Sequence, residues 1–326
     1  MKAVLCRAHG APESLEIGEL PTPTAGDGEV LVEVHAASVN YPDVLMVAGK
    51  YQSQPPMPFA PGSEVGGIVR AVGAGITDLA PGDRVMASTG SGGFAEYAVV
   101  RRRAIRKIPA TMDLNVAAAI GVTYGTSYHA LRQRGNLQPG ETLLVTGAAG
   151  GVGLAAVELG KAMGARVIAC ASSATKLAAA KAAGADEVID YSSGNIRDQI
   201  KDLTGGKGID VCYDAVGGPL FDQLVRSMAW NGRLLIIGFV GGDIPKVAVN
   251  LLLLKGAAAI GVFYGSFAAR EPALDQQNFA EMFRWIEEGT LKPLVSKVYP
   301  FTEYAAAMNA LAHREVIGKV VLQVRA

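Results

Sequence analysis

The clearest chemical signal in the sequence is a glycine-rich turn between a strand-like and a helix-like run. The turn reads GAAGGVG at positions 147–153, after an uncharged β-leaning run at 142–146 and before an apolar, helix-forming run at 154–163. Glycine lets the backbone approach a pyrophosphate, and a helix N-terminus offers unpaired N–H groups and a positive dipole end. This context predicts a dinucleotide phosphate site, although Ala148 breaks the strict G-x-G-x-x-G spacing. The residues expected to form the site are Gly147, Gly150, Gly151, Val152 and Gly153.

The residues after the next strand indicate which dinucleotide is bound. That strand is expected at 166–170, and the sequence ASSATK follows at 171–176. An NAD site usually has Asp or Glu about 20 residues beyond the glycines, to hold the ribose 2′-hydroxyl. Here Ser172, Ser173 and Lys176 stand there instead, which suits a 2′-phosphate. The serines could also cap the next helix, and the lysine could be a solvated charge. The pattern favours NADPH over NADH.

The elements that would position these residues form a doubly wound α/β domain. From residue 141 onward, strand-like and helix-like runs alternate at βαβ spacing, which predicts a parallel sheet with helices on both faces. The expected strands are 142–146, 166–170, 187–190, 209–213, 233–237 and 257–262, and the expected helices are 151–163, 174–183, 195–203 and 217–229.

The rest of the chain has a different pattern. Residues 1–110 contain short alternating runs broken by Gly and Pro, which predicts an antiparallel β-rich body. Residues 115–134 are interpreted as two helical pieces around Gly121 and Gly125. The tail contains one amphipathic helix near 273–288 and a strand at 319–324, so we expect it to return to the N-terminal body. The expected domains are 1–120 with 263–326, and an inserted nucleotide domain at 121–262.

Composition excludes several classes of function. The 326 residues carry 30 Lys+Arg and 30 Asp+Glu, so no net charge attracts nucleic acid or an anionic membrane. No N-terminal signal pattern or membrane span is expected. Three scattered cysteines suit neither a disulfide framework nor a C-x-x-C metal site, and we expect them to be small core residues. A soluble, cytoplasmic protein fits these features.

Several further segments carry a resemblance that covers nearly the whole chain. These segments are SVNYPD (38–43), PGSEVGGIV (61–69), GDRV (82–85), the glycine turn, DAVGG (214–218), IGF (237–239), NLLLLK (250–255) and GKVVL (318–322). With them, the sequence is similar to the medium-chain dehydrogenase/reductase superfamily, in the zinc-free, zeta-crystallin-like branch of NADPH:quinone oxidoreductases. The resemblance implies a GroES-like catalytic domain with an inserted Rossmann domain.

The resemblance also implies that no zinc takes part. Zinc-dependent relatives carry Cys where this chain has Asn40 and His where it has Ser63, and they have a four-cysteine lobe in a region where this chain has no Cys. Two soft ligands of a tetrahedral zinc site are therefore absent. Without a Lewis acid, the expected reaction is reduction of an electron-poor acceptor held over the nicotinamide. Asp43 and Glu64 are expected to be structural anchors.

The family pattern assigns expected roles to further residues. Asn40 and Thr123 would line the nicotinamide end, and Asn40 could donate a hydrogen bond to a carbonyl. Tyr41 and Tyr264 are candidates for steering a proton or stacking on the acceptor, although either could be a packed aromatic. The adenosine 2′-phosphate end would meet Ser172, Lys176 and Tyr191. The remaining expected cofactor contacts are Val216, Phe239, Val240, Val262, Phe263 and Lys319.

The acceptor and the assembly remain open at this point. The leading hypothesis is an NADPH-dependent quinone reductase, and the alternative is an enone, enal or enoyl-CoA double-bond reductase, which needs a proton at carbon. A third hypothesis is an NADPH-binding structural or RNA-binding protein. Its best support is the basic stretch at 101–107, which can also be interpreted as a solvated loop between strands. A homodimer is expected through the edge strand near 257–262.

Overall fold

The computed structural model describes residues 1–325, except the side chain of Ser193, and its chain divides into two compact units. Unit 1 comprises Met1–Gly121 and Pro293–Ala326, and unit 2 comprises Val122–Lys292. The tail therefore returns to the N-terminal body, as expected. Its boundary, however, lies 30 residues beyond the expected 263.

The later boundary has a physical reason in the packing of two helices. Helices α8 (Tyr264–Arg270) and α9 (Pro272–Glu287) belong to unit 2 and contact its π-helical turn. Phe267 stacks on His129 with 3.8 Å between ring centroids. Gln133 donates a hydrogen bond of 3.0 Å to Asn278. Sequence periodicity identified an amphipathic helix here but could not show which unit covers its apolar face.

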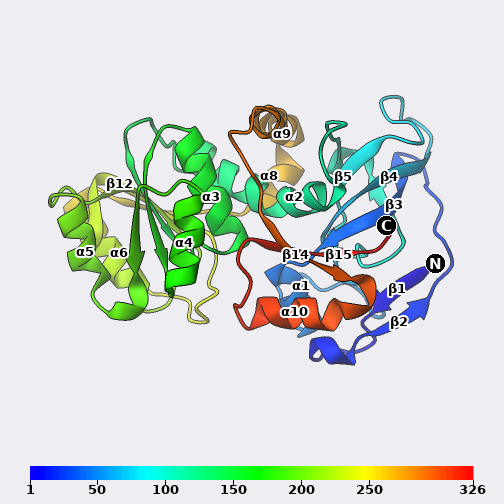
Figure 1. Ribbon diagram of the computed structural model, residues 1–326, viewed down its shortest axis with the longest axis horizontal. Helices are drawn as coiled ribbons and strands as arrows, with labels where there is room; N and C mark the ends of the chain where they lie inside the picture. Colours follow the sequence, from blue (N-terminus) through cyan, green and yellow to red (C-terminus); the bar gives the residue numbers. More distant parts are fainter. Residues whose placement is uncertain (326) are drawn as a thin grey trace. The chain divides into compact units, whose positions relative to one another are not determined.

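Unit 2 is built on a six-stranded parallel sheet in the order β10-β9-β8-β11-β12-β13. This is the strand order of a Rossmann fold, with the order reversing between β8 and β11. Figure 1 shows the sheet with its helices in green to yellow. The strands are β8 (Thr142–Thr146), β9 (Arg166–Ala171), β10 (Glu187–Asp190), β11 (Ile209–Asp214), β12 (Met228–Ile236) and β13 (Ala258–Gly261).

Helices cover both faces of this sheet. On one face, α3 packs so closely that a Cβ on Gly160 would lie 2.5 Å from Leu143. The other face carries an apolar core that includes Leu144 and Ile168 from the strands and Phe221 from α6. Each expected strand and helix of this sheet is present, with bounds that differ by three residues or fewer except at β12, which begins five residues before the expected 233. The helices are α3 (Gly151–Ala162), α4 (Ala174–Ala182), α5 (Ile196–Leu203), α6 (Leu220–Ser227) and α7 (Val249–Lys255), with a short 3-10 turn at Tyr191–Ser193. Helix α7 was not expected.

The expectation of two helical pieces around Gly121 and Gly125 is wrong. A single helix, α2 (Leu114–Tyr128), runs through both glycines and continues as a π-helical turn at His129–Arg134. The glycines serve close packing instead of a turn. A Cβ on Gly121 would lie 2.8 Å from a carboxylate oxygen of Glu64, and one on Gly125 would lie 2.4 Å from the ring of Tyr264.

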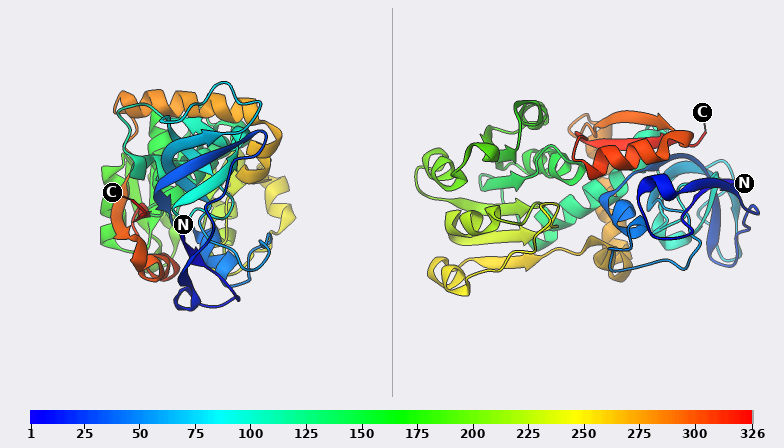
Figure 2. Two further views of the ribbon diagram at one scale, coloured as in Figure 1. Left: turned by 90° about the vertical axis from the view of Figure 1, so that its right-hand side faces the viewer. Right: turned by 90° about the horizontal axis from the view of Figure 1, so that it is seen from below.

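Unit 1 is a β-rich body that contains both ends of the chain (Figure 1). Its main sheet has the order β14-β15-β3-β4-β5-β7, with β6 also paired to β3. Figure 2 shows the red C-terminal segment beside the blue N-terminal strands. A core of buried Val, Leu, Ile and Phe side chains lies beneath this sheet. The elements are β1 (Lys2–Leu5), β2 (Glu16–Glu19), β3 (Glu29–Ser38), β4 (Glu64–Val72), β5 (Arg84–Ser88), β6 (Tyr97–Arg101), β7 (Ile105–Lys107), β14 (Val295–Pro300), β15 (Lys319–Gln323), α1 (Tyr41–Val47) and α10 (Tyr304–Ala312), with 3-10 turns at Pro12–Ser14, Arg102–Ala104 and Phe301–Glu303.

Candidate functional site

The expected cofactor residues of unit 2 gather at one edge of its sheet. All six strands are parallel, so their carboxyl ends lie at the same edge. Five inter-strand steps of ~4.8 Å give an edge of about 24 Å. From β10 to β13, the residues that follow the strand ends are Tyr191, then Ser172 with Lys176, then the turn at 147–153, then Val216, then Phe239 with Val240, and finally Val262 with Phe263.

The glycine turn has the geometry that a phosphate group needs. Gly147 follows β8 with a φ of +59°, and Gly150 caps the N-terminus of α3. A Cβ on Gly153 would lie 2.1 Å from the carbonyl oxygen of Gly147, so only glycine allows the helix to begin this close to the strand. The first N–H groups of α3, from Gly151 and Val152, have no partner within the helix. The residues present therefore fit a bound pyrophosphate.

A buried chain of hydrogen bonds holds this turn against α2 and β11. Ser127 of α2 donates a 2.8 Å hydrogen bond to the carbonyl oxygen of Val152. Its hydroxyl also lies 2.8 Å from that of Tyr213, which is fully buried on β11. Sequence reasoning missed both residues, because neither belongs to a motif. They link α2, the glycine turn and β11.

Asp214 shapes the next loop along the edge. It ends β11, is 1% exposed, and accepts a 2.6 Å hydrogen bond from Thr146 at the end of β8. Its carboxylate also accepts from the backbone N–H groups of Val216 and Gly217. The Asp214 carboxylate thus fixes the backbone of the loop that carries Val216, by accepting hydrogen bonds from the N–H groups of that loop. The signal for this role was a lone acid directly after an apolar strand.

The two serines that follow β9 differ in their surroundings: Ser173 caps α4, and Ser172 is exposed. Ser173 is the N-cap of α4, and its side chain accepts a 3.4 Å hydrogen bond from the backbone N–H of Lys176. Ser172 is exposed and makes no cap, so the capping alternative applies to Ser173 and not to Ser172. No carboxylate follows β9 before α4 begins. The end of β9 is therefore compatible with a 2′-phosphate.

A buried polar cluster occupies unit 1 where α1 begins. Asn40 is the N-cap of α1, and its backbone N–H donates to Asp43 at 2.8 Å. Its side-chain nitrogen donates to Glu64 at 2.9 Å and to Ser63 at 3.3 Å. Its side-chain oxygen accepts from the ammonium of Lys319 at 2.7 Å. An ammonium can only donate and an ionised carboxylate can only accept, so the orientation of the Asn40 amide is fixed.

Lys319 lies inside this cluster. It is 7% exposed and also donates to the carbonyl oxygen of Val39 at 2.9 Å, while its ammonium lies 3.4 Å from Glu64. The three N–H groups of the Lys319 ammonium can therefore be directed to Val39, Asn40 and Glu64. Its expected contact with the cofactor stays a prediction. In the same arrangement both N–H groups of Asn40 have partners, so a hydrogen bond to a substrate carbonyl would replace the longer one, to Ser63.

Burial perturbs the ionisation of this cluster. Asp43 is fully buried, and this raises its pKa to about 7, although the Asn40 backbone N–H and the charge of Lys319 act in the opposite direction. Burial lowers the pKa of Lys319, while the carboxylates of Glu64 and Asp43 oppose that change. One carboxylate oxygen of Asp43 has no hydrogen-bond partner. The cluster thus contains a carboxyl group that can gain or lose a proton near neutral pH.

Tyr51 is a further residue that sequence reasoning missed. It packs half-buried against the core of unit 1. Burial and the negative charge of Asp43 raise the pKa of its phenol. The only sequence signal was its place ten and eleven residues beyond Tyr41 and Asn40, in a loop whose course the sequence does not predict.

The other expected catalytic residues are placed as follows. Tyr41 begins α1 and is half-buried. Thr123 is 3% exposed on α2. Tyr264 donates a 3.1 Å hydrogen bond to Asp275, which is 1% exposed. All three roles stay predictions.

The basic stretch at 101–107 is largely neutralised by acids. Arg101 lies 3.3 Å from Glu29, and Arg102 lies 2.5 Å from Asp78. Lys107 lies 2.6 Å from Asp83 at the end of the stretch. The expectation of a solvated loop holds only for the 3-10 turn at Arg102–Ala104, because Arg101 ends β6 and Arg106 and Lys107 belong to β7, where Arg106 is buried.

Residues 1–325 contain neither a cluster of metal ligands nor a membrane-spanning helix. No group of three or more His, Cys, Asp or Glu residues there could hold a metal ion. No helix in that part of the chain is long and apolar enough to span a bilayer. All three cysteines are buried, as expected of core residues.

Comparison with known proteins identifies the chain's relatives. Residues 26–110 match the family model described as the alcohol dehydrogenase GroES-like domain, and residues 151–288 match the one described as zinc-binding dehydrogenase. The chain is 39% identical to a quinone oxidoreductase-like protein 2 homolog of Nematostella vectensis, over 99% of this chain and 89% of the relative. It is 33% identical to the quinone oxidoreductase of Homo sapiens, over 99% and 97%.

A solved structure adds the cofactor. The Escherichia coli quinone oxidoreductase complexed with NADPH superposes with a TM-score of 0.93 at 28% identity, over 99% of this chain and all of that one. The Rossmann strand order, the glycine turn and the missing carboxylate after β9 agree with that cofactor. The chain belongs to the medium-chain dehydrogenase/reductase superfamily, in its quinone oxidoreductase branch, and is an NADPH-dependent oxidoreductase.

Proposed function

We propose that the protein is an NADPH:quinone oxidoreductase that works without a metal. The observation that carries the proposal is the order of residues along the carboxyl edge of the unit 2 sheet, together with the quinone oxidoreductases among the relatives. The polar groups around Asn40 are an amide, a hydroxyl, two carboxyls and an ammonium. An ammonium among the carboxyls disfavours a second cation there, which supports a metal-independent reaction.

Bound NADPH would supply the hydride, so the protein would mainly bind and orient. The N-terminus of α3 would hold the pyrophosphate, with Ser172, Lys176 and Tyr191 toward the 2′-phosphate. Val216, Phe239 and Val262 follow strands on the other side of the switch point and would line the nicotinamide half. Asn40, held by Lys319 and Glu64, would present a fixed polar surface to the acceptor.

Reduction of an enone, enal or enoyl-CoA double bond is the second candidate. It needs a proton delivered to carbon after hydride transfer. Two groups in unit 1 could exchange that proton. One is Asp43, whose pKa is raised to about 7, and the other is Tyr51, whose pKa is raised by burial and by the negative charge of Asp43. This cluster is the specific observation in favour of the alternative.

One assay separates the candidates. NADPH oxidation is followed with 1,4-benzoquinone and 9,10-phenanthrenequinone, beside crotonyl-CoA and a simple enone, with and without EDTA. Rapid reduction of the quinones that EDTA does not slow is the expected result. Turnover of the enone or acyl-CoA alone would replace the quinone assignment, and loss of activity in EDTA would overturn metal independence.

We also propose a homodimer formed through strand β13. This strand is at the edge of the unit 2 sheet, and Ala258, Ala259 and Gly261 are exposed on it. On the preceding helix α7, Leu253 is 78% exposed and Leu254 is 68% exposed. An unpaired edge strand beside exposed leucines favours pairing with a second copy.

A further inference from the structure

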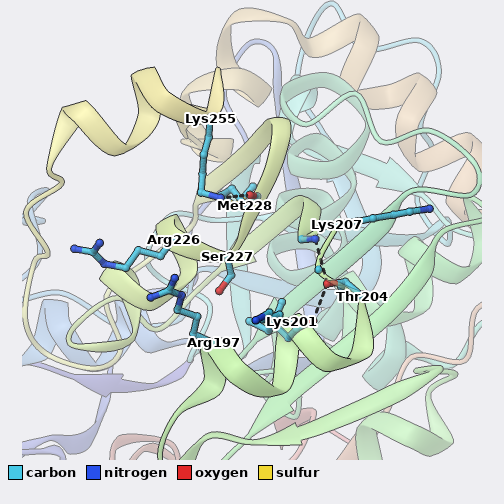
Figure 3. Close-up of a pocket in the computed structure, with 11 residues that line it drawn as sticks. Arg197, Lys201, Thr204, Lys207, Arg226, Ser227, Met228 and Lys255 are labelled. Atoms are coloured by element: carbon cyan, nitrogen blue, oxygen red, sulfur yellow. Dashed lines mark hydrogen bonds between the residues drawn. The ribbon is translucent and has the colours of Figure 1, made fainter.

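A cavity of about 200 Å³ lies in unit 2 at the edge of the sheet opposite the glycine turn. It is lined by Gly208 and Met228, which stand at the beginnings of β11 and β12. The glycine turn follows the end of β8, and β8 is parallel to β11, so the two sites lie at opposite edges. Figure 3 shows the side chains around the cavity. The proposed cofactor site does not use it.

The cavity is strongly basic. No Asp or Glu is among its lining residues. Arg226 has a carboxylate partner on its own helix, Asp222, at 2.7 Å. Lys255 donates to the carbonyl oxygen of Met228 at 2.8 Å (Figure 3). The cations that line the cavity are Arg197, Lys201, Lys207, Arg226 and Lys255.

Helix dipoles explain only part of this charge. Lys255 ends α7, and Arg226 lies in the last turn of α6, where a helix C-terminus favours cations. Arg197, in contrast, is the second residue of α5, and the positive end of that dipole disfavours a cation there. Its placement at the cavity therefore has no explanation in the stability of its own helix.

Two of the cations also repel each other. Arg197 and Lys201 are four residues apart on α5, so they lie on one face of the helix. Among the described residues, no carboxylate forms an ion pair with Arg197 or with Lys201. Like charges at this spacing destabilise a helix, and an anion between them would remove the repulsion.

The size and lining of the cavity restrict the ligand. Ile200, Thr204 and Met228 are buried and form part of its wall. A Cβ on Gly208 would lie 2.6 Å from the carbonyl oxygen of Ser227, so the backbone closes tightly there. The volume is below the ~300–1,000 Å³ of pockets that enclose a drug-sized ligand. No aromatic residue lines the cavity to stack on a base.

We propose that this cavity is a second anion site, which binds the phosphate or pyrophosphate group of a small molecule. Arg197 and Lys201 are its principal donors, because guanidinium and ammonium groups make charge-assisted hydrogen bonds to phosphate oxygens. Arg226 and Lys255 add positive charge around them. The site lies apart from the 2′-phosphate and pyrophosphate of NADPH, so both can be occupied at once.

Isothermal titration of the NADPH-saturated protein tests the proposal, because saturation blocks the cofactor's own phosphate sites. Inorganic phosphate, pyrophosphate and ADP are titrated separately, which distinguishes a bare phosphate group from a nucleotide. We expect pyrophosphate to bind with an affinity that falls as salt concentration rises. The double variant Arg197→Gln/Lys201→Gln should weaken that binding at least about tenfold.

Two matched variants control this experiment. Arg270→Gln/Arg284→Gln removes the same charge from α8 and α9 and should bind pyrophosphate as the wild type does. Lys201→Arg keeps the charge and should retain binding. No pyrophosphate binding to the wild type, equal weakening in both double variants, or stronger binding of ADP than of pyrophosphate would each overturn the assignment. NADPH binding is measured in the same variants and should not change. Because no turnover is measured, the pyrophosphate result is independent of which acceptor the enzyme reduces.

Discussion

At the scale of single residues, we propose that the choice of cofactor depends on a few side chains after β9. Ser173 caps α4, which leaves the exposed Ser172 and the half-buried Lys176 beside the expected position of the 2′-phosphate. An ammonium near a phosphate contributes a charge-assisted hydrogen bond of ~1.5–3 kcal/mol. The preference for NADPH should therefore respond to one lysine.

Replacing Lys176 by Ala should raise the KM for NADPH by about ten- to a hundredfold and leave the KM for NADH unchanged, because only NADPH carries the 2′-phosphate. Steady-state kinetics with each cofactor measure this. Lys181→Ala is the matched control, since Lys181 lies on the same helix but contacts the carbonyl oxygen of Asp186. An equal rise for both cofactors would show that Lys176 acts on the fold and not on the phosphate.

The titration of Asp43 gives a second prediction at this scale. Its pKa of about 7 in the folded chain exceeds the usual 3.8. A carboxyl that binds its proton more tightly when folded stabilises the fold fully below the unfolded pKa, and this contribution is lost as pH rises toward 7. The loss is of the order of 4 kcal/mol.

Asp43→Asn should remove this dependence. The free energy of unfolding of the wild type, relative to the variant, should fall between about pH 4 and pH 7 and become constant above that. Urea denaturation across this pH range measures the difference. A difference that is independent of pH would contradict the raised pKa of Asp43.

At the scale of elements, one lysine joins three parts of unit 1. Lys319 begins β15, Asn40 caps α1, and Glu64 begins β4. The ammonium and the amide connect all three elements through hydrogen bonds of 2.7 and 2.9 Å. Removing one partner of a buried ion pair leaves the other charge uncompensated, which costs more than removing both.

Lys319→Met should destabilise the protein by about 3–5 kcal/mol, because it leaves Glu64 and Asp43 without their cation. The double variant Lys319→Met/Glu64→Gln should be destabilised by less than the sum of the single changes. Lys2→Met, at an exposed lysine on β1, is the control and should change stability by no more than about 0.5 kcal/mol. Chemical denaturation measures the wild type, Lys319→Met, Glu64→Gln, the double variant and the control. Strict additivity would mean that Lys319 and Glu64 do not interact.

At the scale of the whole molecule, each unit depends on pairing between distant segments. Strand β15 pairs with β3, so unit 1 is completed only by the last residues of the chain. Unit 2 places the glycine turn beside the point where its strand order reverses. Its last strand, β13, has one neighbour in the sheet and leaves an edge for a second copy.

The proposed dimer should be visible in light scattering coupled to size-exclusion chromatography. At micromolar concentration we expect twice the 33.8 kDa mass of the chain. Leu253→Glu/Leu254→Glu should produce the monomer, because it puts two charges in an apolar interface. Ile17→Glu, at an exposed residue of unit 1, should remain dimeric. A wild-type monomer at this concentration would exclude the dimer.

The sequence alone determined the local features of this protein. The bounds of β8, α3 and their neighbours in unit 2 followed from apolar periodicity, because each strand and helix is specified by residues close to one another in the chain. The glycine turn was evident for the same reason, since the required φ angles and close approach need glycine at particular positions. NADPH followed from the absence of an acid between the end of β9 and the start of α4, about 20 residues beyond that turn.

Features that depend on contacts between distant residues could not be predicted from the sequence. Lys319 and Asn40 are 279 residues apart, and nothing in either segment indicates that they meet. Gly125 suggested a break between two helical pieces, but it lies inside α2, where the absence of a side chain leaves room for the ring of Tyr264. The assignment of α8 and α9 to unit 2 and the raised pKa of Asp43 also depend on contacts between residues that are distant in the sequence. Packing sets burial and charge environment, and packing joins residues without regard to their separation in the sequence.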